Sequence, residues 1–219
     1  MPLDRELGGR WRTSRLGFAL TLLVVLTLCA ALPRLAVAAD HGHAVTSRGH
    51  AVTHRGGCAN APDSATRTPA RTLRSAVVCL VNQERARYHL PALRQVPKLV
   101  ASAQGYTGEM VRDDFFSHTG PGGSTPGARI AAAGFQWSWM GENIASGFTT
   151  PLSVVTAWMG SQGHCANILS PAFTDIGVGV SPHAVAPAVG GATWTEDFGL
   201  PMGARAPSGD WGPANSCPH

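Results

Sequence analysis

The fold is organised around three short runs, Phe116-Ser117-His118, Gly141-Glu142-Asn143-Ile144-Ala145 and Gly163-His164-Cys165-Ala166-Asn167-Ile168-Leu169. Each run places one side chain that can bind a metal or transfer a proton beside glycine or a small polar residue. These side chains are the imidazoles of His118 and His164 and the carboxylate of Glu142. We therefore expect the three residues to lie close together at one site.

Helical periodicity dominates the sequence before residue 160. Apolar residues recur at helical spacing over 73–88, from Pro97 to about residue 113, over 126–134 and over 151–159. The pattern then changes to the alternation of a strand over 176–180 and 192–197, with a turn-rich segment between. Helices followed by strands, with a short extended piece near Glu142, predict an α+β domain with an antiparallel sheet.

The chain of 219 residues is long enough for one ordinary domain. Its net charge of +4 is mild and owes much to N-terminal arginines, so we expect no nucleic-acid partner. Residues 1–38 resemble a secretion signal, with arginines, an apolar run over 16–32 and a small-residue cleavage site, Ala36-Val37-Ala38. An uncleaved membrane anchor is the alternative. We predict a secreted monomer that has no contact with the membrane after cleavage.

Residues 39–71 are expected to form a linker, because a seven-residue segment at 42–48 repeats at 49–55 with few large apolar residues. Histidines in this segment could bind a metal weakly, but a solvated spacer is the reading that we prefer. The folded domain is predicted to span 72–200, and 201–219 to form a C-terminal tail.

Four cysteines remain once the signal is removed: Cys58, Cys79, Cys165 and Cys217. An even number in an exported chain indicates two disulfides, with three possible pairings. Cys58 and Cys79 are close in sequence, whereas the near-terminal Cys217 needs a distant partner. We therefore predict the pairs Cys58–Cys79 and Cys165–Cys217.

The three runs also resemble motifs of the CAP superfamily of cysteine-rich secretory proteins, antigen 5 and pathogenesis-related 1 proteins, in its bacterial secreted branch. The resemblance extends from residue 75 to 199 and includes Asn82-Gln83-Glu84-Arg85 and Trp194-Thr195-Glu196-Asp197-Phe198-Gly199. It implies a three-layer α-β-α sandwich with a central antiparallel sheet. It also implies a cleft lined by His118, Glu142 and His164, with Ser161 where many relatives have a second glutamate.

Several readings of these residues remain open. Two neutral imidazoles and one carboxylate suit zinc or another divalent cation, with a fourth position left for water. The resemblance also allows a small lipid or a peptide in the cleft, or an extracellular protein as partner. Alternatively, His164 caps the end of a helix, Arg85 pairs with a loop carboxylate, and Asn143 and Asn167 fasten loops.

A binding module is the function that we expect. A metal-assisted hydrolase acting on peptides or cell-wall material is one alternative. The sequence has no His-Glu-x-x-His or Gly-x-Ser-x-Gly motif, which argues against an enzyme. The other alternative is a host- or envelope-facing interaction protein with a vestigial cleft.

Overall fold

The computed structural model describes residues 57–206 and 216–218. The helices are α1 (Ala70–Arg87), α2 (Pro97–Arg112), the 3-10 turn η1 (Pro121–Gly123), α3 (Pro126–Ala132), α4 (Pro151–Met159) and α5 (Gln162–Ile168). The strands are β1 (Arg94–Gln95), β2 (Trp137–Phe148), β3 (Asp175–Ser181) and β4 (Ala192–Pro201). They form one sheet in the order β1-β3-β4-β2.

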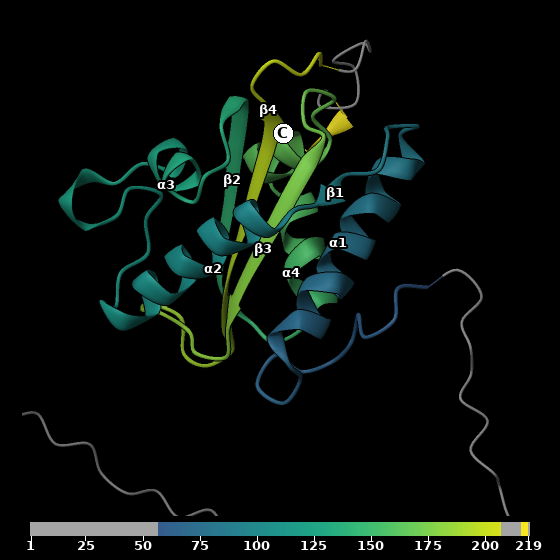
Figure 1. Cartoon of the computed structure of the whole chain (residues 1–219). Helices are drawn as coiled ribbons and strands as arrows, with labels where there is room; N and C mark the ends of the chain where they lie inside the picture. Colours follow the sequence, from purple (N-terminus) through teal and green to yellow (C-terminus); the bar gives the residue numbers. More distant parts are fainter. Residues whose placement is uncertain (1–56, 207–215, 219) are drawn as a thin grey trace, which may run out of the picture. The chain divides into compact units, whose positions relative to one another are not determined.

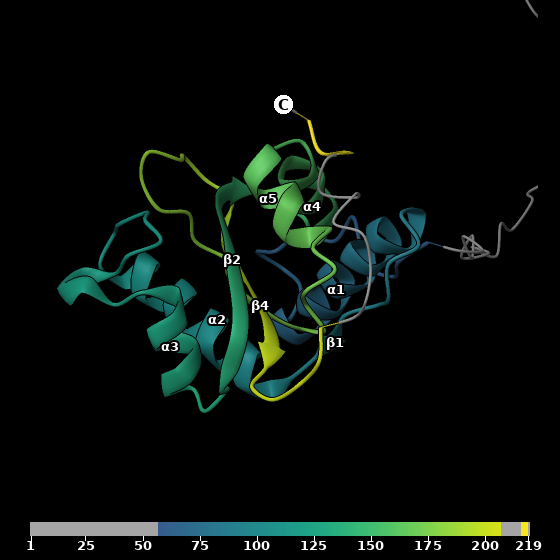
Figure 2. The same ribbon diagram turned by 90° about the horizontal axis from the view of Figure 1, so that it is seen from above.

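The helices cover both faces of this sheet, which confirms the predicted α+β three-layer sandwich. Figures 1 and 2 show α1, α4 and α5 on one face and α2 with α3 on the other. The sheet is antiparallel apart from β1, which runs parallel to β3 at Arg94 and Gln95. β1 is this short because Pro97 follows it after a single residue, Val96, and starts α2.

One face of β3 carries large apolar side chains and the other carries glycines. Ile176, Val178 and Val180 are buried in the main apolar core, which includes residues of α1, α4 and α5. Gly177 and Gly179 face α2, where a methyl group would overlap the helix backbone at Leu99 and Ala103, respectively. The alternation seen in the sequence therefore lets the backbone of α2 lie directly on the sheet.

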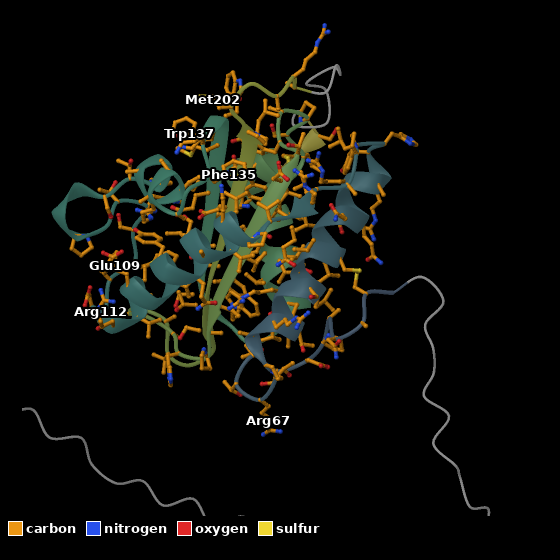
Figure 3. All side chains as sticks on the ribbon, viewed as in Figure 1. Arg67, Glu109, Arg112, Phe135, Trp137 and Met202 are labelled. Atoms are coloured by element: carbon orange, nitrogen blue, oxygen red, sulfur yellow. A yellow bond between two sulfur atoms is a disulfide. The ribbon has the colours of Figure 1, made fainter. Side chains whose placement is uncertain are left out.

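A smaller apolar cluster lies near the start of α2, between that helix, α3 and the start of β2. Leu99, Ile130 and Phe135 are buried together, with Trp137 packed against them. Figure 3 shows Phe135 and Trp137 at the end of the molecule that also carries Met202. The amide of Met202 donates to the carbonyl of Gln136 at 2.9 Å, so the end of β4 is fastened to the start of β2.

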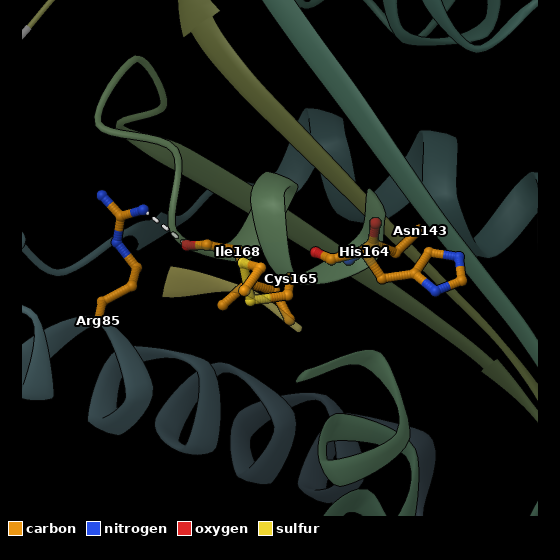
Figure 4. Close-up of a disulfide and its surroundings, with 6 residues drawn as sticks. Arg85, Asn143, His164, Cys165 and Ile168 are labelled. Carbon is orange, nitrogen blue, oxygen red and sulfur yellow. Dashed lines mark hydrogen bonds between the residues drawn. A yellow bond between two sulfur atoms is a disulfide. The ribbon is translucent and has the colours of Figure 1, made fainter. Parts of the chain in front are cut away.

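A buried arginine holds α1 against the segment that precedes β3. Arg85 donates at 2.8 Å to the carbonyls of Pro91, Ile168 and Ser170 and also reaches the carbonyl of Phe173 at 3.4 Å. Figure 4 shows its bond to Ile168. The expected loop carboxylate is not its partner, because four carbonyls already satisfy the guanidinium.

Both predicted disulfides are confirmed, Cys58–Cys79 and Cys165–Cys217. The first ties residues ahead of α1 to that helix. In the same segment, which we expected to be linker, Ala61 and Ala65 are buried in the main core. The predictions on the signal peptide, the repeat and residues 207–215 lie outside the described residues. Within 57–206, no helix has the length and hydropathy of a membrane span.

The structure differs from the predicted elements around the candidate site. The extended piece near Glu142 is a full strand, β2, of 12 residues. His164 lies inside a further helix, α5, which the glycine at 163 obscured in the sequence, so His164 does not cap a helix end. Trp158 is buried in the core, at 1% exposure.

We predict that Gly179→Ala lowers the free energy of unfolding by about 1–3 kcal/mol or more, because backbone atoms of α2 cannot move aside as a side chain could. Chemical denaturation measures this change. Gly105→Ala is the matched control, since it lies in α2 with no atom within 4 Å of the added carbon and should be neutral or stabilising by up to about 1 kcal/mol. Equal effects of the two substitutions would contradict the close approach of α2 to β3.

Candidate functional site

Glu142 is the buried centre of the candidate site. Its side chain is 2% exposed and accepts hydrogen bonds on both oxygens. His118 Nδ1 lies 2.8 Å from Oε1, and Arg129 Nη2 lies 2.7 Å from Oε2. The structure thus places His118 next to Glu142, with the guanidinium of Arg129 as a third member.

Arg129 also orders the loop that carries His118. Its guanidinium donates to the carbonyls of His118 at 3.0 Å and Ser124 at 2.7 Å. The same group stacks on the ring of Tyr106, 3.2 Å from the ring centroid, in a cation–π contact. Tyr106 in turn donates its hydroxyl to the carbonyl of Ser117. Burial raises the pKa of Tyr106 to about 12, so this hydroxyl keeps its proton.

β4 places a second carboxyl group beside Glu142. Asp197 is the cross-strand partner of Glu142 and is 1% exposed. Burial, followed by the negative charge of Glu142, raises the pKa of Asp197 to about 8. Asp197 is therefore mostly protonated at neutral pH, which spares the site a second buried negative charge.

His164 and Ser161 lie together on the other side of β2. Both line a pocket of about 530 Å³ at the outer edge of that strand. Burial lowers the pKa of His164, and the charge of His118 lowers it further. The two imidazoles are thus close enough to interact, and His164 is mostly neutral at pH 7. Its remaining neighbours in the pocket are mainly apolar: Phe116, Ile144, Ala145, Ser146, Phe148, Ala157, Trp158, Ala186, Pro187 and Ala188.

Two asparagines fix α5 against β2. Asn143 donates to the carbonyl of His164 at 3.2 Å and to Glu196 Oε2 at 3.1 Å. Asn167 donates to the carbonyl of Glu142 at 3.2 Å and to Asn143 Oδ1 at 2.9 Å. Figure 4 shows Asn143 beside His164. The asparagines fasten the backbone around the site.

A metal site made of His118, Glu142 and His164 stays a prediction. The residues described by the structure contain no group of three His, Cys, Asp or Glu side chains placed to hold a metal ion. Glu142 gives both oxygens to His118 and Arg129, and the nearby guanidinium repels a cation. Zinc at Glu142 would have to overcome the positive charge of Arg129 beside it.

Arg129 is the site residue that reasoning from sequence missed. It is the only lysine or arginine between residues 113 and 204. Because Arg129 is the only cation in this stretch and lies close to Glu142 in the sequence, a pairing of the two could have been predicted. The part of the pocket wall formed by 186–188 had no such signal, because its position depends on how the β3–β4 loop folds back.

Comparison with known proteins agrees with this architecture. The model of the CAP family, described as the cysteine-rich secretory protein family, matches residues 78–196, more than half of the chain. The chain belongs to the CAP family. The uncharacterised protein YkwD of Bacillus subtilis is 38% identical over 144 residues, which are 64% of this chain and 53% of YkwD. The chain thus spans about half the length of this relative.

Solved structures of bacterial proteins share the CAP fold. One is an extracellular protein of Bacillus anthracis that contains an SCP domain, with a TM-score of 0.53, 28% identity and coverage of 59% of this chain and 41% of that one. Another is an outer surface protein of Borrelia burgdorferi, with a TM-score of 0.51, 21% identity and coverage of 57% of this chain and 90% of that one. The second likeness shows the fold alone.

We predict that Arg129→Met lowers the free energy of unfolding by about 3–5 kcal/mol at neutral pH, because Glu142 then lacks its guanidinium partner. Denaturant titration measures the loss. The double variant Arg129→Met with Glu142→Met should recover much of it, since no unpaired charge stays buried. Arg112→Met, which breaks an exposed ion pair, serves as control. A double variant no more stable than Arg129→Met would contradict the pairing.

We predict that Glu196→Gln stabilises the protein at pH 8 and has little effect at pH 4. Burial raises the pKa of Glu196 to about 8 and leaves Oε1 without a partner among the described residues. The folded chain thus favours the protonated acid, and its stability falls as pH rises from about 4.5 towards 8. The neutral amide removes this loss, on the order of a few kcal/mol at pH 8. Melting temperatures of the wild type and of Glu196→Gln, measured from pH 4 to pH 8, should become equal at low pH. A constant difference between them across this range would contradict the raised pKa of Glu196.

Proposed function

We propose that this chain is an extracellular binding protein whose pocket at the outer edge of β2 takes a small amphipathic molecule. The observation that carries the proposal is the pocket of about 530 Å³, lined mainly by apolar side chains, with Ser161 and His164 among its few polar groups. Its volume is typical of sites for small ligands.

The apolar part of the ligand would lie along β2 and α4. Phe148 and Trp158 provide aromatic surface, and the small side chain of Ala157 leaves space on α4. The third polar residue of the lining, Ser146, has its hydroxyl bonded to the backbone of Val185 at 2.9 and 3.2 Å. Few donors or acceptors are therefore left for a peptide backbone, and a lipid-like chain fits better.

The polar end of the ligand would lie at Ser161 and His164. A neutral imidazole offers one donor and one acceptor, and a serine hydroxyl can also donate and accept. A hydroxyl group on the ligand matches this pair without bringing a charge. A carboxylate would instead favour a protonated His164, against the effect of burial and of His118 on its pKa.

An extracellular location is supported by two observations. Both disulfides belong to the folded domain, and such bonds persist in oxidising compartments. The relative from Bacillus anthracis is described as extracellular.

A divalent cation is the second candidate ligand. It is supported by the two imidazoles of His118 and His164, since neutral imidazole is a common zinc ligand. This candidate has to overcome the positive charge of Arg129 beside Glu142. Binding in the apolar pocket meets no such obstacle, and we therefore rank it first.

We expect the full chain to bind a medium-chain fatty alcohol more tightly than the fatty acid of the same length. Ala157→Phe should weaken the binding of the alcohol by about tenfold or more, because the ring fills the pocket. Calorimetric titration measures both affinities, and adding zinc chloride in a parallel titration tests the second candidate.

Thr156→Phe is the matched control for this experiment. Thr156 is exposed on the same helix and does not line the pocket, so its substitution should leave the affinity unchanged. Equal binding by the wild type and Ala157→Phe would exclude the pocket as the binding site.

A further inference from the structure

A second groove lies between α1 and α2, at the edge of the sheet opposite β2. Its volume is about 580 Å³. Arg71 and Arg74 of α1 form one wall, Gln104 lies on the α2 side, and Gln95 of β1 also lines it. The two arginines are three residues apart and so share one face of the helix.

The edge of β3 holds Arg74 in place. β1 pairs only with Asp175 and Ile176, which leaves the outer edge of β3 without a strand partner further along. There, Gln104 bonds to both backbone groups of Val180, accepting from its N–H and donating to its carbonyl at 3.1 Å each. The same Gln104 oxygen accepts from Arg74 Nη2 at 2.6 Å. The guanidinium is thus fixed at the groove.

Arg74 has no anionic partner among the described residues. Its Nε is enclosed and makes no hydrogen bond with them, and no carboxylate lines the groove. Burial lowers the pKa of Arg74, which is the effect expected of a cation that loses water without gaining a counter-ion.

The carboxylate next to β1 already has a partner, because Asp175 of β3 pairs with Arg94 at 2.8 Å. The first turn of α1 carries no acidic residue, so the positive end of its helix dipole adds to the same field. An anion that balances the positive charge of Arg71 and Arg74 would have to come from outside the described part of the chain.

We propose that the groove between α1 and α2 binds a phosphate ester, with the phosphate group on Arg71 and Arg74. Guanidinium groups match phosphate oxygens with two parallel hydrogen bonds. The groove is much larger than a single phosphate, and Pro97, Val100 and Ala101 of α2 give it an apolar wall. The ligand therefore carries a small uncharged body next to its phosphate. This site is separate from the pocket at β2 and does not depend on the function proposed for that pocket.

Two sources could supply this chemistry, a soluble phosphate ester or the headgroup of a phospholipid. The full chain is titrated with glycerol phosphate by calorimetry, and its co-sedimentation with phosphatidylglycerol vesicles is compared with that on phosphatidylcholine vesicles. Binding in either arm supports the site if it depends on the two arginines, and the arm that binds identifies the source. Every variant retains residues 1–56, so any contribution from them is common to all.

Arg74→Gln should weaken binding by about tenfold, the change expected when one charge-assisted pair is lost. Arg74→Lys retains the charge but not the planar fork, and should restore only part of the affinity. Arg71→Gln is a second test variant in case the Arg74 variants lose stability. Arg71 is exposed, so its substitution should leave the fold intact. It should weaken binding severalfold.

Arg87→Gln removes the same charge from the far end of α1 and is the matched control. It should bind within about twofold of the wild type, since exposed charges far from the ligand contribute little through screened solvent. The proposal is overturned if the wild type binds neither ligand at moderate salt, or if Arg71→Gln and Arg74→Gln bind as Arg87→Gln does.

Discussion

The backbone of α2 lies directly on the glycine face of β3, and this contact fixes the position of Tyr106, the residue of α2 that belongs to the candidate site. Gly177 and Gly179 allow this approach, and Thr107 of α2 adds a bond of 2.8 Å to Thr195 of β4. Tyr106, next to Thr107, then lies under Arg129 and reaches the loop that carries His118. A larger residue on β3 would displace α2 and, with it, the support of that loop.

The sheet also explains how so many polar groups are tolerated in a small core. Side chains alternate along β4, so Asp197 faces Glu142 while Glu196 faces Asn143 on the other side. An ionised Asp197 on the neighbouring strand would repel Glu142, but burial and the charge of Glu142 keep Asp197 mostly protonated at neutral pH, and burial does the same for Glu196. Glu142 remains the centre of the site, because Arg129 and His118 can balance its charge.

The sequence predicted what depends on local pattern. Helix starts at Pro97, Pro126 and Pro151, the strand alternation of β3 and the pairing of the cysteines all follow from neighbouring residues or from simple counting. The candidate residues His118 and Glu142 were found because their motifs are specific. Arg129 was missed because its role depends on three segments meeting in space. The groove at Arg74 was missed for a similar reason, since it exists only where α1, β1 and α2 come together.

Both edges of the sheet raise the same physical problem, which the chain solves in the same way. An open edge exposes backbone groups that can pair with other chains. On β2, Asn167 and Trp158 donate to the carbonyls of Glu142 and Ile144, at 3.2 and 3.4 Å. On β3, Gln104 bonds to both backbone groups of Val180. Side chains that bond to an edge in this way fill less space than a further strand would, so space is left beside the edge. The pocket beside β2 and the groove beside β3 lie at these two edges, and they are the places where we propose that ligands bind.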